Sequence, residues 1–188
     1  MRKQDGSVSA PDSRRRGLVL VYTGNGKGKT TASLGLALRA IGHGSKVFML
    51  QFMKGPGNMY GEHVAAEKYL PMLKRVRSGR ECFVDKKNPS AEDVRLAREG
   101  LDAARKAISS CEYDLVILDE INVALDYHLV ELADVLDLIK SRPGHVDLVL
   151  TGRYAPPDIV EMADLVSEVN EVKHHYRSGV PAREGIEY

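Results

Sequence analysis

A nine-residue stretch rich in glycine and lysine, residues 23–31, constrains the fold of this chain more than any other feature. An apolar run, 18–22, precedes it, and a segment of small residues, 32–41, follows it. This order predicts a strand, a glycine-rich turn and a helix, which is the setting of a phosphate-binding loop. In such a loop, backbone N–H groups and the positive end of the helix surround an anion.

The loop residues have separate predicted roles. Lys27 and Lys29 would supply positive charge to phosphates, and the hydroxyl of Thr30 can bind Mg²⁺. The expected nucleotide contacts within the loop are Thr23, Gly24, Asn25, Gly26, Lys27, Gly28, Lys29, Thr30 and Thr31. Thr23 stands where the common pattern G-x-x-x-x-G-K-[ST] has glycine. The alternative, a glycine-rich turn with unrelated lysines, is disfavoured because strand and helix lie on the required sides.

The rest of the chain alternates between apolar runs and amphipathic segments. Further strands are predicted at 46–52, 73–77, 115–120, 146–150 and 165–172, and helices at 30–41, 62–70, 90–108, 130–141 and 156–163. The alternation predicts an α/β fold, a mostly parallel sheet with helices on both faces, in the P-loop NTPase (RecA-like) architecture. Residues 17–188 are predicted to form a single domain after a basic, flexible segment, 1–16.

Composition bears on possible binding partners and on the cellular compartment. The net charge of +1 gives no general positive field for nucleic acid or a membrane surface. No apolar run reaches the length of a membrane span. The two cysteines show no metal or redox spacing, which fits a reducing cytoplasm. The run Arg14-Arg15-Arg16 could pair with phosphates, but a solvated flank is the favoured interpretation.

Two carboxylates follow the apolar run at 115–118. Asp119 and Glu120 end this predicted strand, where a second Mg²⁺ partner is expected in a phosphate-binding fold. Alternatively, they cap the next turn. The loop at 51–57 should also border the nucleotide, because parallel sheets bind ligands at the carboxyl ends of their strands. In that loop Phe52 and Met53 are equally well explained as core residues or as ligand contacts.

Several separated motifs resemble one family, the ATP:corrinoid adenosyltransferases of bacterial cobalamin biosynthesis. The resemblance covers residues 17–188, and Thr23 at the start of the loop is normal in that family. The matching stretches are 21–31, 51–55, 118–120, 142–145, 151–153, 171–174 and 185–188.

The resemblance implies a specific reaction. The Co(I) centre of a reduced corrinoid attacks the ribose 5′-carbon of ATP, tripolyphosphate leaves, and a cobalt–carbon bond forms. No side-chain nucleophile or base is needed, so the protein positions the substrates and stabilises charge, here through Lys27 and Lys29. Mg²⁺ would be held by Thr30 with Glu120 or Asp119. The family also suggests that Arg39 contacts a nucleotide bound in reversed orientation, that the enzyme is a homodimer, and that a flavoprotein is the reductant.

The chain departs from the family in one loop. Better-known members carry a Phe-x-Trp pair after a glycine, and these aromatics are held to cover the lower face of the corrin. Here the residues are Gly79-Arg80-Glu81-Cys82-Phe83, and the chain has no tryptophan. The hypothesis is that Phe83 takes over this contact. The predicted corrinoid-binding residues are Phe52, Lys54, Cys82, Phe83 and Arg153.

Two other functions stay open from the sequence. A phosphoryl-transfer kinase or ATPase on the same fold could use Asp119 and Glu120 near the γ-phosphate. A non-catalytic nucleotide switch or corrinoid-binding regulator would bind ATP without forming a cobalt–carbon bond. Because no further ligand stands at metal spacing from His174 and His175, the sequence argues against a zinc site there.

Overall fold

The computed structural model describes residues 16–57 and 60–188. Its strands are β1 (Val19–Thr23), β2 (Val47–Phe52), β3 (Leu73–Ser78), β4 (Leu115–Asp119), β5 (Asp147–Thr151) and β6 (Leu165–Glu168). Its helices are α1 (Lys29–Gly42), α2 (Gly61–Tyr69), α3 (Ala91–Ser109), α4 (Ile121–Asp126), α5 (Leu132–Ser141), α6 (Pro157–Met162) and the 3₁₀ turn η1 (His175–Ser178). The strands form one parallel sheet in the order β3-β2-β4-β5-β1-β6. The predicted α/β class with a parallel sheet is confirmed.

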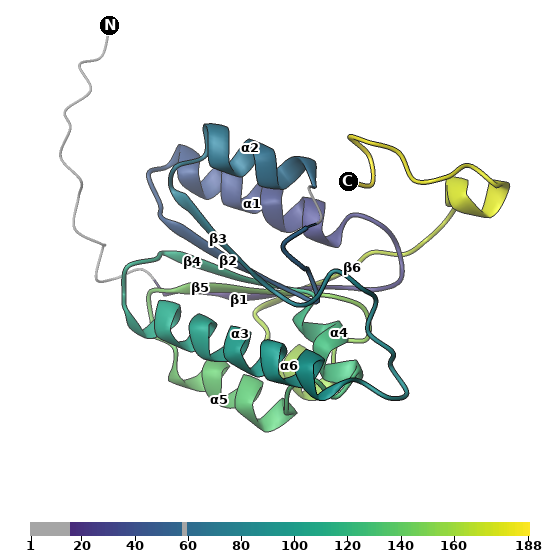
Figure 1. Cartoon of the computed structure of the whole chain (residues 1–188). Coiled ribbons are helices and arrows are strands. Elements are labelled where there is room, and N and C mark those ends of the chain that lie inside the picture. The colour runs from purple at the N-terminus through teal and green to yellow at the C-terminus, as the bar shows by residue number, and fades with distance from the viewer. Residues whose placement is uncertain (1–15, 58–59) are drawn as a thin grey trace, which may run out of the picture.

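Helices cover both faces of the sheet. Figure 1 shows α1 and α2 on one face and α3 to α6 on the other. Strand side chains alternate between these layers: Val47 and Met49 of β2 pack in the cluster with α1 and α2, whereas Phe48 and Leu50 pack in the cluster on the opposite face. A strand covered on both sides is apolar throughout, which explains the uninterrupted hydrophobic runs in the sequence.

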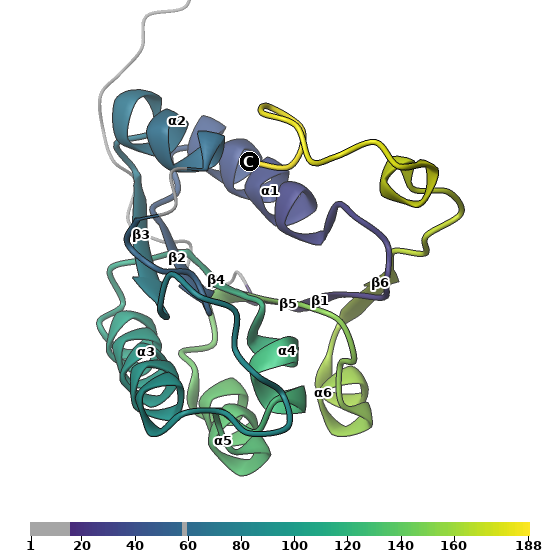
Figure 2. The same cartoon turned by 45° about the vertical axis from the view of Figure 1, so that its right-hand side comes forward.

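The carboxyl ends of three central strands meet at one edge of the sheet. β5 lies between β4 and β1, so the turns that follow these strands are neighbours (Figure 2). The phosphate loop follows β1, Glu120 follows Asp119 at the end of β4, and Gly152 follows β5. The topology therefore places the motifs at this edge, as the rule for parallel sheets predicts.

Two elements differ from the sequence-based expectation. The last strand ends at Glu168 and does not continue to 172. After this strand, the Val169 carbonyl accepts a hydrogen bond from Gly26 N (2.7 Å), so the segment that follows β6 lies beside the phosphate loop. The short helix α4 was not predicted. It begins directly after Glu120, whose backbone is left-handed (φ 63°).

The predicted basic segment falls almost wholly outside the described residues. Its last member, Arg16, pairs with Asp164, which also accepts a hydrogen bond from the backbone N–H of Val19 at 2.9 Å. Within residues 16–57 and 60–188, every helix is too short or too polar to cross a bilayer.

Candidate functional site

The phosphate loop is held against the segment that follows β6. A Cβ atom built on Gly26 would lie 2.8 Å from the carbonyl oxygen of Val169, closer than real Cβ contacts allow. Gly28, immediately before α1, has a φ of 123°, a conformation that side chains rarely adopt. Both glycines are therefore required by the path of the backbone. The Thr23 hydroxyl accepts a hydrogen bond from Ala155 N (3.2 Å), which gives threonine a structural role where glycine is usual.

The ammonium group of Lys29 lies inside the loop. It donates hydrogen bonds to the carbonyl oxygens of Gly24 (2.8 Å) and Gly26 (2.7 Å), and the residue is 7% exposed. Burial lowers the pKa of Lys29, because the charged form loses solvation, and the positive charge of Arg153 adds to this effect. The lysine is thus positioned by backbone groups, with its charge at the centre of the loop.

Asp119 links three strands at the base of the site. Its Oδ1 accepts hydrogen bonds from the hydroxyls of Thr30 (2.9 Å) and Thr151 (2.7 Å), and its Oδ2 accepts one from Gln51 Nε2 (3.2 Å). The side chain is fully buried, and burial raises the pKa of Asp119, while the three hydrogen bonds act in the opposite direction. The carboxylate therefore holds the first turn of α1 against β2 and β5.

Glu120 faces a group of positive charges. Burial and the charge of Asp119 raise the pKa of Glu120, whereas Lys29, Lys54 and Arg153 lower it. Its backbone N–H donates to Thr151 Oγ1 at 2.9 Å, which fixes the turn after β4. The predicted residues Lys54 and Arg153, from two different loops, are thus brought to the same site as the carboxylates.

The donor set at this site fits a magnesium ion. Mg²⁺ prefers oxygen ligands and is commonly held by one or two carboxylates together with substrate phosphates. Thr30, Asp119 and Glu120 offer oxygen atoms only, and the Thr30 hydroxyl is already in contact with Asp119. The alternative that Asp119 and Glu120 merely cap a turn accounts for the position of Glu120 before α4, but Asp119 caps nothing and bonds to the loop helix.

The individual site residues predicted from the sequence do not include three residues that support Asp119. Thr151 and Gln51 contact it directly, and His63 of α2 contacts Gln51 (Nε2 to Oε1, 3.0 Å). Gln51 and Thr151 are buried polar residues at or next to the carboxyl ends of mainly apolar strands, and that contrast was an available signal. His63 carried no comparable signal, since its place depends on how α2 packs.

Two predicted site residues are not brought to this site. Phe52 is 0% exposed and packs in the hydrophobic core, so the expected corrinoid contact is wrong and the core alternative holds. Arg39 lies in the last turn of α1 and is exposed. It is ten residues after Lys29, about 15 Å along the helix axis, which places it away from the loop of its own chain.

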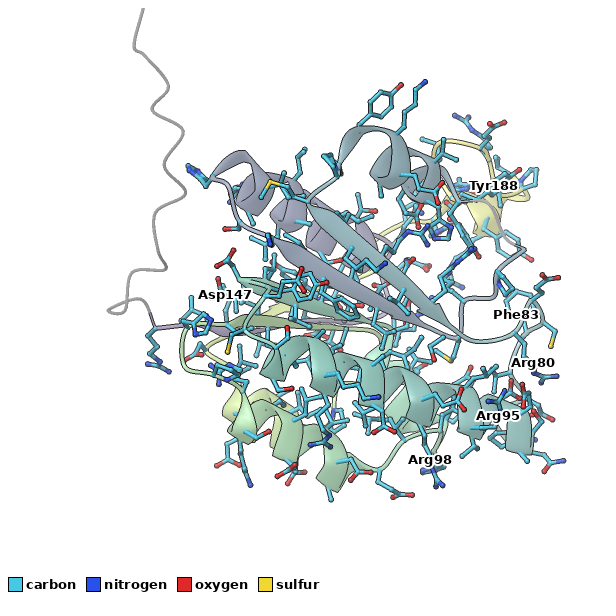
Figure 3. All side chains as sticks on the ribbon, turned by 60° about the vertical axis from the view of Figure 1, so that its left-hand side comes forward. Arg80, Phe83, Arg95, Arg98, Asp147 and Tyr188 are labelled. Carbon is cyan, nitrogen blue, oxygen red and sulfur yellow. The ribbon has the colours of Figure 1, made fainter. Side chains whose placement is uncertain are left out.

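Cys82 and Phe83 lie in the loop between β3 and α3, and both are exposed. Figure 3 shows Phe83 and Arg80 at the same end of the molecule as Tyr188, opposite Asp147 at the amino end of β5. Arg80 forms two 2.7 Å hydrogen bonds to Asp93, which anchor the loop at the start of α3. The loop is therefore fixed at its base and presents an apolar ring to solvent.

Comparisons with known proteins agree with this geometry. Residues 15–188 match the family described as ATP:corrinoid adenosyltransferase BtuR/CobO/CobP. A corrinoid adenosyltransferase of Sinorhizobium sp. is 37% identical over 182 residues, which cover 96% of this chain and 85% of that protein. Corrinoid adenosyltransferases of Escherichia coli K12 (38% identical; 92% of this chain, 86% of that protein) and Salmonella typhimurium LT2 (35%; 95% and 89%) are similar over nearly the same span. The chain therefore belongs to the ATP:corrinoid adenosyltransferase family and is an enzyme of this type.

Proposed function

We propose that this enzyme transfers the 5′-deoxyadenosyl group of ATP to the Co(I) centre of a corrinoid and releases tripolyphosphate. The electron pair of Co(I) forms the bond to the 5′-carbon, and the broken C–O bond leaves its electrons on the triphosphate. The product is adenosylcobalamin or an adenosylated precursor. The proposal rests mainly on the buried ammonium group of Lys29, which lies inside the glycine-rich loop. The next residue, Thr30, donates a hydrogen bond to the carboxylate of Asp119.

The leaving group determines what the loop must do. Tripolyphosphate carries several negative charges, so stabilising them as the C–O bond breaks lowers the barrier. Lys29 would exchange its two carbonyl partners for phosphate oxygens, and the N–H groups between Asn25 and Thr31 would contribute further donors. Lys27, at the rim of the loop, would add a second charge. None of these groups acts as a nucleophile or base.

Magnesium belongs in the same proposal. Thr30, Asp119 and Glu120 would hold the ion, and bound Mg²⁺ would neutralise part of the charge on the triphosphate. The support is the oxygen-only donor set described above. Thr151 and Gln51 would keep the Asp119 carboxylate oriented while its Oδ1 faces Thr30.

The corrinoid is proposed to lie over the exposed end of the loop between β3 and α3. Phe83 would pack on the corrin face, Cys82 would be its neighbour, and Lys54 and Arg153 would border the ring from the direction of the carboxylates. The support is the full exposure of Phe83 and the position of Lys54, whose ammonium lies 4.2 Å from the centre of the Tyr60 ring.

The oligomeric state, the reductant and the cellular location are also proposals. A homodimer and a flavoprotein that supplies the electron to Co(II) are proposed from the family resemblance, and a cytoplasmic location is proposed from the spacing of the two cysteines. Size-exclusion chromatography with light scattering tests the first of these, since a monomeric mass at working concentration contradicts it.

An anaerobic assay tests the reaction itself. ATP, Mg²⁺ and chemically reduced corrinoid are mixed with the enzyme, and the expected result is a light-sensitive alkylcobalt spectrum that depends on all three. ATP cleavage without an alkylcobalt product would favour a phosphoryl-transfer enzyme. ATP binding without either product would favour a regulator.

A further inference from the structure

The end of the chain returns to the phosphate loop. After β6 it passes through η1 and comes back across the face covered by α1 (Figure 2). Glu187 Oε2 accepts a hydrogen bond from Lys27 Nζ at 3.0 Å, and the tail approaches α2, where a Cβ built on Gly61 would lie 3.9 Å from the Tyr188 carbonyl oxygen. The carboxyl-terminal tail thus lies beside the phosphate loop and the start of α2.

Three metal-ligating side chains converge in this tail. His174, His175 and Glu187 each offer a ligand atom, and these atoms all lie within 4.8 Å of one another. The two imidazole rings are stacked, with centroids 4.6 Å apart. His175 Nε2 lies 3.5 Å from Glu187 Oε1, and all three residues are partly buried. This convergence was not predicted from the sequence, because Glu187 is separated from the histidines by the turn η1 and the segment that follows it.

The two carboxylate oxygens of Glu187 are in different environments. Oε2 is paired with Lys27, whereas Oε1 is buried and accepts no hydrogen bond within the described residues. A buried carboxylate oxygen that accepts no hydrogen bond is unfavourable, because it has lost water, and the His175 ring 3.5 Å away offsets this loss only when that ring is protonated. A cation between Oε1 and the imidazoles would satisfy it.

The present contacts of the histidines leave room for an ion. His174 Nδ1 accepts one hydrogen bond from Tyr176 N (3.2 Å). Whichever ring nitrogen binds a metal, this bond is lost, since Nδ1 then either holds the metal or carries the proton. That loss is confined to one exposed hydrogen bond. Glu171, which is paired with Arg177, adds negative charge that acts on His174.

We infer that His174, His175 and Glu187 form a site for a borderline divalent transition-metal ion such as Zn²⁺, which fixes the carboxyl-terminal tail beside the phosphate loop. Two imidazoles and one carboxylate form a ligand set that Zn²⁺ accepts, with a further position left to water. This set differs in kind from the oxygen-only set of Thr30, Asp119 and Glu120. We therefore expect the tail site to prefer Zn²⁺ and the site of Thr30, Asp119 and Glu120 to prefer Mg²⁺.

Zinc binding can be measured without the reaction. The full chain, stripped of metal with a chelator, is titrated with Zn²⁺ by calorimetry in excess Mg²⁺ and without nucleotide. One equivalent of Zn²⁺ is expected to bind. His175→Ala and Glu187→Gln should each weaken this binding by about tenfold or more, since each removes one ligand. His43→Ala, which removes an exposed imidazole at the end of α1, is the matched control and should bind as the wild type does.

A Co²⁺ titration gives a second readout. The visible absorption of Co²⁺ reports coordination, so the wild type should show a band that His175→Ala and Glu187→Gln lose and His43→Ala retains. Circular dichroism checks that the variants are folded, which is expected because the tail lies outside the core. Absence of Zn²⁺ binding in the wild type, or unchanged Zn²⁺ and Co²⁺ binding in both tail variants, would overturn the inference.

Discussion

At the residue scale, the site depends on charges that are buried before any substrate is present. Lys29 is held by two carbonyl groups, and Asp119 is held by three side-chain donors. Preorganised charge of this kind is effective in catalysis because little reorganisation is needed during the reaction. The same arrangement predicts which substitutions damage activity while leaving the fold intact.

Replacement of Lys29 should abolish most of the activity. Lys29→Met retains much of the side-chain volume but removes the charge that would meet the departing triphosphate. We expect kcat/KM to fall by about 10²–10³-fold, the range seen when one charge-stabilising donor is lost. Steady-state rates of alkylcobalt formation measure this effect. Lys46→Met, at an exposed lysine, is the control, and equal rates for both variants would contradict the role of Lys29.

Replacement of Thr30 should affect the metal more than the fold. Thr30→Val removes the hydroxyl, but Asp119 keeps its hydrogen bonds from Thr151 and Gln51. We expect a loss of about 1 kcal/mol in the free energy of unfolding and a clear rise in the Mg²⁺ concentration needed for half-maximal rate. Thr30→Ser, which restores the hydroxyl, should reverse the change in Mg²⁺ requirement. An unchanged requirement in Thr30→Val would exclude Thr30 as a ligand.

At the element scale, α3 and the loop before it form one unit. Ser90 caps α3 through a reciprocal pair of hydrogen bonds with Asp93. Asp93 also binds Arg80, which fixes the base of the loop that carries Phe83. The carboxylate of Asp93 thus both caps the start of α3 and anchors the loop before it.

This shared carboxylate makes stability depend on pH. The Arg80 guanidinium, aided by Ser90, lowers the pKa of Asp93 to about 2 from its usual 3.8. Because the folded state favours the ionised form, the contribution is complete above the usual pKa and is lost as the pH falls from about 4 to 2. Asp93→Asn should cost roughly 1–2 kcal/mol at pH 7 and much less near pH 2. Urea unfolding at both pH values tests this, and an equal cost at both would contradict it.

Phe83 should matter for corrinoid binding and not for stability. Its side chain is fully exposed, so Phe83→Ala should change the free energy of unfolding by less than about 0.5 kcal/mol. We expect a higher KM for the corrinoid, an altered Co(II) spectrum, and an unchanged KM for ATP. Phe83→Leu, which keeps an apolar side chain, should retain part of the affinity. Unchanged turnover and Co(II) spectra in Phe83→Ala would remove Phe83 from the corrinoid site.

The sequence predicted elements well where a periodic pattern set them. The buried strands and the apolar face of α3 followed from spacing alone, as Ala97, Leu101 and Ala104 show by their burial. Helix α4 was missed because it is short and starts from the left-handed Glu120 without a side-chain cap. Phe52 was ambiguous because an apolar residue at a strand end suits both a core and a ligand.

At the scale of the whole molecule, contacts between distant segments escaped prediction. The hydroxyl of Thr151 meets Asp119 only because β5 lies beside β4, and Glu187 meets Lys27 only because the tail folds back. Neither contact leaves a periodic trace in the sequence. The motifs predicted several residues of the candidate site, but the sheet order was needed to show which of them lie together.

The pair between Lys27 and Glu187 should compete with the nucleotide. Lys27 cannot both hold Glu187 and turn fully toward the triphosphate, so Glu187→Gln should tighten MgATP binding. The pair is partly exposed, which limits the gain to severalfold at low salt, and the gain should shrink as salt rises. Calorimetry with a non-hydrolysable ATP analogue measures it. Weaker binding by Glu187→Gln would show instead that Glu187 supports the nucleotide directly.

In the proposed reaction the phosphate loop retains a complete triphosphate while carbon is transferred to cobalt. The most direct measurement is the ratio of tripolyphosphate to alkylcobalt formed under anaerobic conditions with reduced corrinoid. We expect equal amounts of the two products and no ADP. Formation of ADP and phosphate without an alkylcobalt species would contradict it.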